Sequence, residues 1–186
     1  MMKSNKIVYV LGTKAQFIKC KFILKYLNES GQDLIILDTG QHKEITQREL
    51  LELNFDYEYI DISISKNNIS TIYTMIKWFF ILVFLVKKDD SLESATHCLV
   101  HGDTASTLIG LIYGKKHKLD IVHLESGYKS NNIFKPFPEE IIRNIVSKYS
   151  DILVVDGKEM LNNVSKYKNK KEIIEINRNT IYDSTT

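Results

Sequence analysis

Short apolar runs alternate with longer amphipathic stretches along this chain, which predicts alternating strands and helices. The predicted strands cover residues 7–11, 34–37, 57–62, 98–100, 121–124, 152–155 and 172–176. The predicted helices cover residues 17–28, 44–53, 70–86, 104–114, 139–148 and 158–167.

The strand runs are apolar throughout, which is typical of a parallel sheet covered by helices on both faces. We therefore expect an α/β fold with a single doubly wound, mostly parallel sheet, and one Rossmann-like domain over residues 1–186. The one long irregular stretch, Ser126 to Pro136, follows the carboxyl end of a strand, where long loops are usually functional.

The helix predicted over residues 70–86 is unusual because Trp78 to Val86 is apolar at nine consecutive positions. Its apolar length of about 15 residues falls short of the about 20 that cross a bilayer, so we expect no membrane span. Since a helix that only covers a sheet needs one apolar stripe, this helix is also expected to face another protein surface. That surface is either a second copy or a different chain.

Composition and charge narrow the class of protein. The chain has 25 basic and 23 acidic residues and a net charge of +2, which argues against a nucleic-acid partner. Cys20 and Cys98 lack paired spacing, which argues against a disulfide scaffold or a zinc site. The N-terminal residues contain no cleavable signal pattern. Together these features predict a cytoplasmic location.

Acidic residues stand at three successive chain crossings, as Asp103, Glu125 and Glu139. In an open α/β sheet such positions converge on the ligand crevice, and carboxylates gathered there suggest proton chemistry. Two of these acids also have a structural explanation: Asp103 could cap the following helix, and Glu139 suits the first turn of a helix with Pro138 at its first position. A capping role is less obvious for Glu125, which is followed by Ser126-Gly127. Arg143 shares a helix face with Glu139 and could pair with it or bind an anion.

The loops after the first predicted strands give a weaker indication of a ligand site. Gly12-Thr13 contains only one glycine, so an ordinary tight turn explains it as well as a ligand loop does. His42, His101 and His123 lie near strand ends, where each could be a buried, hydrogen-bonded imidazole. Their spacing does not make a metal set, and we expect none.

Taken in order, these segments form a recognisable series. The series is Gly12-Thr13, Gly40-Gln41-His42, His101-Gly102-Asp103-Thr104, Glu125-Ser126-Gly127, Pro138-Glu139-Glu140 with Arg143, and Asn179-Thr180 with Asp183. It resembles the non-hydrolysing UDP-N-acetylglucosamine 2-epimerase family, most specifically in the HGDT and FPEE-x-x-R segments at their mutual spacing. The resemblance covers the N-terminal half of a two-domain, glycosyltransferase B-type fold whose active site lies between two Rossmann-like halves.

The resemblance implies a function in polysaccharide biosynthesis. Family members interconvert UDP-N-acetylglucosamine and UDP-N-acetylmannosamine by eliminating UDP and adding it back. The implied catalytic residues are Asp103, Glu125 and Glu139, with Arg143 in support. The implied substrate-binding residues are Thr13, Lys14, Gln41, His42, His101, Thr104, Glu140 and Asn179, of which Gln41 and His42 match a segment that helps bind an activating UDP-sugar in bacterial relatives. No metal or redox cofactor is implied.

The sequence also departs from the family pattern. The usual GTR-P-E reads Gly12-Thr13-Lys14-Ala15-Gln16, the usual AGLR reads Ser126-Gly127-Tyr128-Lys129, and Arg178 replaces a glycine. Lysine does not reproduce the bidentate contacts of arginine with phosphate.

Three hypotheses remain open. The chain is the N-terminal subunit of a split epimerase that needs a separate C-terminal polypeptide, a non-catalytic binding or regulatory module, or a fragment of a longer enzyme such as a hydrolysing epimerase. The expected ligand is a UDP-sugar. The expected protein partner is the C-terminal polypeptide, a second copy of the chain, or both. By itself the chain is expected to be inactive.

Overall fold

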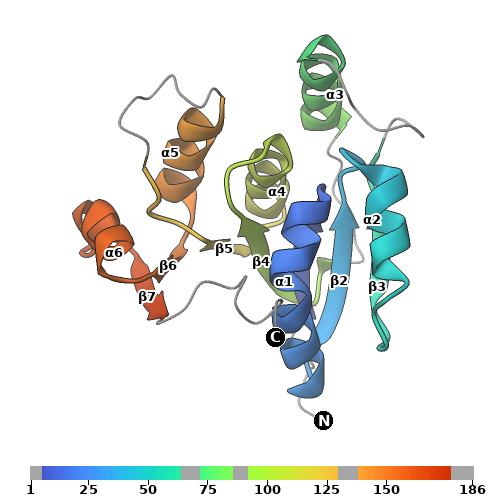
Figure 1. The fold of residues 1–186 in the computed structure, drawn as a ribbon, viewed down its shortest axis with the longest axis horizontal. Coiled ribbons are helices and arrows are strands. Elements are labelled where there is room, and N and C mark those ends of the chain that lie inside the picture. Colours follow the sequence, from blue (N-terminus) through green and yellow to red (C-terminus); the bar gives the residue numbers. More distant parts are fainter. Residues whose placement is uncertain (1–5, 64–71, 86–91, 130–137, 177–186) are drawn as a thin grey trace.

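The computed structural model describes residues 6–63, 72–85, 92–129 and 138–176, whose strands form one parallel sheet (Figure 1). The strands are β1 (Lys6–Leu11), β2 (Asp33–Asp38), β3 (Glu58–Asp61), β4 (Ala95–His101), β5 (Asp120–Leu124), β6 (Ile152–Asp156) and β7 (Glu172–Ile176). Their spatial order is β3-β2-β1-β4-β5-β6-β7, and every neighbouring pair is parallel. The predicted fold class is confirmed.

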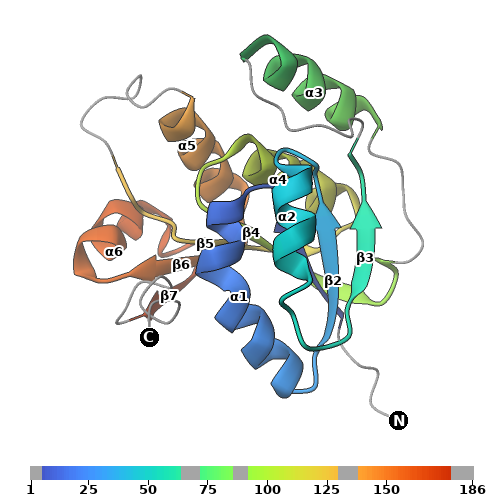
Figure 2. The same cartoon turned by 45° about the vertical axis from the view of Figure 1, so that its right-hand side comes forward.

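Helices cover both faces of the sheet (Figures 1 and 2). They are α1 (Lys14–Glu29), α2 (Lys43–Leu50), α3 (Ile72–Leu85), α4 (Ala105–Lys116), α5 (Glu139–Tyr149) and α6 (Lys158–Val164), which a short 3₁₀ turn at Ser165–Tyr167 follows. The first two helices pack on one face, and α4, α5 and α6 pack on the other. Helix α3 lies outside α4, where Trp78 and Leu82 contact Ile109.

The central strands explain why their sequences do not alternate in polarity. In β1, Val8 and Val10 belong to the core on the α4 side, whereas Tyr9 and Leu11 belong to the core on the α1 side. All four side chains have no exposed surface. A strand between two helical layers therefore buries every side chain, as the apolar runs predicted.

The ends of three helices differ from the prediction by a few residues. Helix α1 begins at Lys14 rather than Phe17, because Thr13 and Gln16 cap each other's backbone N–H groups. Helix α2 ends earlier than expected, at Leu50. Pro138 is the N-cap residue of α5, not its first helical residue as predicted.

The order of the strands sets the position of a ligand crevice. The chain runs outward from β1 through β2 to β3 and then returns to β4 on the other side of β1, so the connections diverge between β1 and β4. Ligands of open α/β sheets bind at the carboxyl ends of the strands at such a switch point. At this point the backbone of Gly12 lies so close to Ser106 that no side chain fits between them: a Cβ atom would lie 1.9 Å from Ser106 Oγ.

No helix within the described ranges is long and apolar enough to cross a membrane. Helix α3, the most apolar, has Tyr73, Ile76, Phe80 and Phe84 exposed on its outer side. These side chains form an exposed apolar stripe, and the contact of this helix with another protein surface stays a prediction.

Candidate functional site

A cavity of about 360 Å³ opens at the carboxyl ends of β4 and β5, beside the switch point. Its lining side chains carry charge of both signs. The lining residues are Lys19, Gly102, Asp103, Glu125, Tyr128 and Arg143. Asp103, Glu125 and Arg143, which the sequence singled out, thus come together in the structure.

Glu125 lies where β5 ends and has a left-handed backbone, with φ at +54°. Such a conformation is costly for a residue with a side chain, and strained residues of this kind cluster at functional sites. The side chain is 9% exposed, and its Oε2 atom lies 2.7 Å from Lys19 Nζ and 3.5 Å from His101 Nε2. Its Oε1 atom is buried and accepts no hydrogen bond from the part of the chain that the structure describes.

Two cationic neighbours keep Glu125 ionised. Burial alone would raise the pKa of the carboxyl group, but His101 and Lys19 lower that pKa to about 2. Burial alone would lower the pKa of His101, but Cys20 and Glu125 outweigh it and raise that pKa to about 10. At neutral pH Glu125 can therefore accept a proton or a hydrogen bond but has no proton to donate.

Asp103 follows the left-handed Gly102 and makes an ion pair with Arg143 of α5. The guanidinium group also lies 2.7 Å from Glu140 Oε2, so it links two carboxylates. The suggestion that Asp103 caps the next helix is wrong, because Thr104 is the N-cap residue of α4 and its side chain accepts from Thr107 N.

Glu139 is the first residue of α5, near this ion-pair network. Its pairing with Arg143, one of the two readings of the sequence, is not observed: the guanidinium group contacts Glu140 and Asp103 instead. Glu139 Oε2 is buried without a hydrogen-bond partner among the described residues. Of the three predicted catalytic carboxylates, it is the one for which no ion pair is observed in the described chain.

The loop after β1 is organised differently, around Gln16. Its Oε1 atom accepts from the backbone N–H groups of Gly12 and Thr13, both at 3.1 Å. Its Nε2 atom donates to the His101 carbonyl oxygen at 3.0 Å and lies 3.1 Å from Thr104 Oγ1. The backbone N–H groups of Gly12 and Thr13, which the ligand-loop reading of this segment would direct at an anion, are thus occupied by the protein itself.

None of the predicted substrate-binding residues that the structure describes lines the cavity. Lys14 pairs with Glu49 of α2 at 2.7 Å. Gln41 accepts from Ser106 Oγ at 2.6 Å, and His42 donates its backbone N–H to the Gly12 carbonyl group at 2.8 Å. Asn179, Thr180 and Asp183 lie outside the described residues.

The structure adds residues that the sequence did not single out. Lys19 and Tyr128 line the cavity, and Tyr128 donates its hydroxyl proton to Asp156 Oδ2 at 2.5 Å. Lys19 lies on the same helix face as Gln16, one turn further from the helix start, and this spacing is the one sequence signal that would have indicated it. In the described ranges, no group of three or more His, Cys, Asp or Glu side chains is arranged to hold a metal ion.

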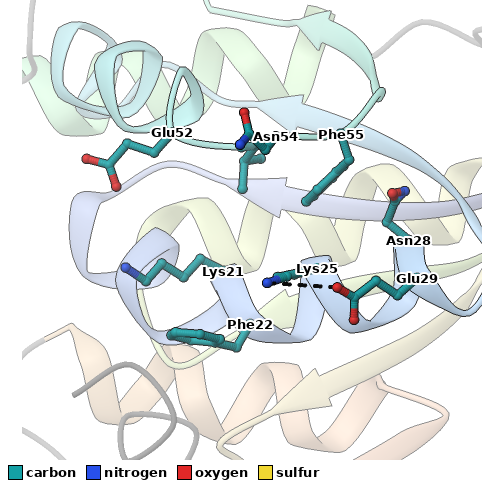
Figure 3. A pocket seen from close by; sticks show the side chains of 9 residues that line it. Lys21, Phe22, Lys25, Asn28, Glu29, Glu52, Asn54 and Phe55 are labelled. Atoms are coloured by element: carbon teal, nitrogen blue, oxygen red, sulfur yellow. Dashed lines mark ion pairs between the residues drawn. The ribbon is translucent and has the colours of Figure 1, made fainter. Parts of the chain in front are cut away.

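A second cavity, of about 350 Å³, lies between the last turns of α1 and the connection from α2 to β3 (Figure 3). Its polar side chains are solvated, and its one ion pair, between Lys25 and Glu29, is long at 3.8 Å. None of the predicted site residues lines it. The predicted site residues that line a cavity therefore all lie at the first one, at the carboxyl ends of β4 and β5.

Comparison with known proteins points to one family. The family model for UDP-N-acetylglucosamine 2-epimerase matches residues 25–186. The UDP-N-acetylglucosamine 2-epimerase of Salmonella borreze is 26% identical over 185 residues, which cover 97% of this chain and 47% of the relative. The UDP-2,3-diacetamido-2,3-dideoxy-D-glucuronate 2-epimerase of Pseudomonas aeruginosa is 32% identical over 167 residues, which cover 86% of this chain and 44% of the relative.

A solved structure gives the same result. The crystal structure of the Methanocaldococcus jannaschii UDP-GlcNAc 2-epimerase, in complex with UDP-GlcNAc and UDP, superposes with a TM-score of 0.76 at 27% identity. The match covers 97% of this chain and 48% of that one. The chain thus spans about half the length of the curated relatives that it matches.

Proposed function

Since the chain belongs to the UDP-N-acetylglucosamine 2-epimerase family, we propose that it forms the N-terminal half of an enzyme that interconverts UDP-N-acetylglucosamine and UDP-N-acetylmannosamine. The observation that carries this proposal is the cavity at the ends of β4 and β5, where Asp103, Glu125 and Arg143 meet. Charged groups of both signs suit a reaction in which a proton and an anionic leaving group depart together.

The proposed reaction divides into an elimination and its reversal. A base removes the proton from carbon 2 of the sugar, the bond from carbon 1 to the UDP oxygen breaks, and a double bond forms between the two carbons. UDP then adds back at carbon 1, while an acid returns a proton to the opposite face of carbon 2. Atoms and charge balance, so no redox cofactor is needed.

The site suggests how the carboxylates share these tasks. Glu125 is kept ionised by Lys19 and His101, which suits a hydrogen-bond acceptor or base. Asp103 is oriented by Arg143, which in turn is held by Glu140. Glu139 has no ion-pair partner among the described residues, and its buried Oε2 atom accepts no hydrogen bond from them, so we assign it as the third carboxyl group that faces the reaction.

We further propose that activity requires the second half of the relatives' length, whether a separate polypeptide or the rest of a longer chain provides it. A two-domain fold binds its ligand between the halves, and this chain contributes one wall. The test combines the 186-residue chain with a C-terminal epimerase half and follows UDP-N-acetylmannosamine and deuterium incorporation at carbon 2 by NMR. We expect turnover only in the mixture; turnover by the chain alone, or none in the mixture, contradicts the proposal.

A non-catalytic binding module is the second candidate function. It is favoured by the loop after β1, where Gln16 occupies the Gly12 and Thr13 amides and Lys14 is paired with Glu49. In that case the mixture would bind UDP-N-acetylglucosamine without exchanging deuterium at carbon 2. The same experiment therefore separates the two functions.

A further inference from the structure

His123 of β5 contacts both the turn between β4 and α4 and helix α5, and it does not line the cavity. It lies on β5 and is fully buried. Its Nε2 atom lies 2.8 Å from the Gly102 carbonyl oxygen, and its Nδ1 atom lies 3.3 Å from Ser147 Oγ on α5. A carbonyl oxygen only accepts hydrogen bonds, so Nε2 must carry a hydrogen.

The ring is neutral at physiological pH. Burial lowers the pKa of His123 to about 4, and the positive charges of His101 and Arg143 act in the same direction. In the neutral form Nδ1 has a lone pair, which accepts the hydroxyl proton of Ser147. The geometry thus defines one tautomer, with the hydrogen on Nε2.

The Gly102 turn is held on both sides by β5. Gly102 donates its N–H to the Leu124 carbonyl oxygen at 3.1 Å, and its own carbonyl oxygen accepts from His123. Its φ of +69° is a left-handed conformation, in which a small rotation would redirect the next side chain. That next residue is Asp103.

Helix α5 closes a ring of contacts around this turn. Arg143 and Ser147 are four residues apart and share a helix face. Arg143 contacts Asp103 directly, while Ser147 contacts His123, which holds the residue before Asp103. The side chain and the backbone of the Asp103 segment are therefore fixed by the same face of α5.

We propose that His123 is a positioning residue for Asp103, holding the Gly102 turn through its Nε2–H so that the carboxylate meets Arg143. The inference rests on the proposed function for its catalytic consequence, but its geometry can be tested separately. A histidine that only fills the core would affect stability without changing the Asp103–Arg143 pair.

The test compares His123→Gln with His123→Asn in the full chain. The glutamine amide nitrogen is placed where Nε2 lies and can still reach the Gly102 carbonyl group, whereas the shorter asparagine cannot. In wild-type protein, ¹⁵N spectra should show a neutral Nε2–H ring that does not titrate between pH 5.5 and 8. The Arg143 guanidinium signals, kept sharp by the ion pair, should survive in His123→Gln and broaden or vanish in His123→Asn.

Affinity provides a second readout. UDP-N-acetylglucosamine binding to the chain, completed by its C-terminal half, should weaken about tenfold in His123→Asn and less than about threefold in His123→Gln. If His123→Asn does not fold, Ser147→Ala replaces it, with the same signals expected to broaden and a loss of about threefold. Equal Arg143 signals in all folded variants, or a ring that titrates in this pH range, would overturn the inference. Failure of the wild-type complex to bind the nucleotide sugar would instead refute the proposed function, while the Arg143 signals still decide the role of His123.

Discussion

The loops after β1 and β5 lie at the same edge of the sheet but use their polar groups differently. After β1, the Gly12 and Thr13 amides are saturated by Gln16, which is 2% exposed. After β5, Glu125 has a left-handed backbone and a buried oxygen that accepts no hydrogen bond from the described chain. An unsatisfied buried polar atom costs about 1–3 kcal/mol.

This difference separates a loop that serves folding from one that serves a ligand. Backbone strain and unsatisfied oxygens lower stability, so they persist where another requirement maintains them. The β1 loop has neither, whereas the β5 loop has both. We therefore expect substitutions after β1 to act on stability, and substitutions at the ends of β4 and β5 to act on ligand chemistry.

The largest expected effect concerns the three predicted catalytic carboxylates at and near the cavity. In the enzyme completed by its second half, Asp103→Asn, Glu125→Gln and Glu139→Gln should each lower turnover at least about 100-fold, the scale of a lost acid or base. The matched control is Glu29→Gln, an exposed carboxylate at the second cavity, which should leave turnover unchanged. NMR assay of UDP-N-acetylmannosamine measures this. Activity within a few-fold of wild type for all three variants would contradict the assignment.

On the folding side, Gln16→Leu should reduce the free energy of unfolding by about 2 kcal/mol, because it leaves buried backbone N–H groups without their acceptor. Gln47→Leu is the control: Gln47 is exposed, and its contact with Tyr59 is long at 3.5 Å, so it should change stability by less than about 0.5 kcal/mol. Urea denaturation compares the two. If they lose equal stability, Gln16 does not organise the β1 loop.

Helix α3 has one face that packs on the protein and one that is exposed. On the packed face, Trp78 Nε1 donates to the carbonyl oxygen of Thr39, which directly follows β2, at 3.0 Å. The outer stripe of Tyr73, Ile76, Phe80 and Phe84 is exposed, and we predict that it pairs with a second copy. Phe84→Glu should weaken self-association at least about tenfold, with the fold intact. Light scattering and circular dichroism test this, with Leu82→Glu, at a side chain 2% exposed, expected to unfold the chain. A wild-type chain that is monomeric at high micromolar concentration would refute the interface.

The smallest effect is a pH dependence that originates on the ligand side. His101 binds its proton more tightly when folded, with a pKa near 10 against 6.5, so its contribution to stability is complete below pH 6.5 and is lost as the pH rises toward 10. His123 has a pKa of about 4 when folded, against 6.5, so stability is lost as the pH falls from 6.5 toward 4.

When the pH falls from 6.5 to 5.5, the free energy of unfolding should therefore decrease by about 1 kcal/mol less in His123→Gln than in the wild type. Glu125→Gln removes the carboxylate that stabilises the His101 imidazolium, so it should flatten the decline above pH 6.5. Urea denaturation series at pH 5.5, 6.5 and 8.5 measure both slopes. Unchanged slopes in both variants would show that these histidines do not titrate as described.

Much of the fold followed from the sequence because local pattern and tertiary environment agree. The run from Ile7 to Leu11 predicts a strand between two helical layers, and β1 is fully buried from Val8 to Leu11. The predictions missed by a few residues where a side chain caps a helix, as Gln16 does for α1. The Thr13-x-x-Gln16 spacing is a capping-box pattern, so the sequence itself carried the signal for this helix start.

The sequence by itself determined which chemical groups stand at the strand ends: Asp103 after β4, Glu125 after β5, and Glu139 with Arg143 at the start of α5. Only the tertiary structure decided how they are paired. Arg143 bonds to Asp103, 40 positions away, and Lys19 to Glu125, 106 positions away, because the strand order β1-β4-β5 places these segments side by side. Ion pairs and hydrogen bonds act over a few ångströms, so the partner of a charge is set by strand order and helix phase, which a linear pattern of residues does not contain.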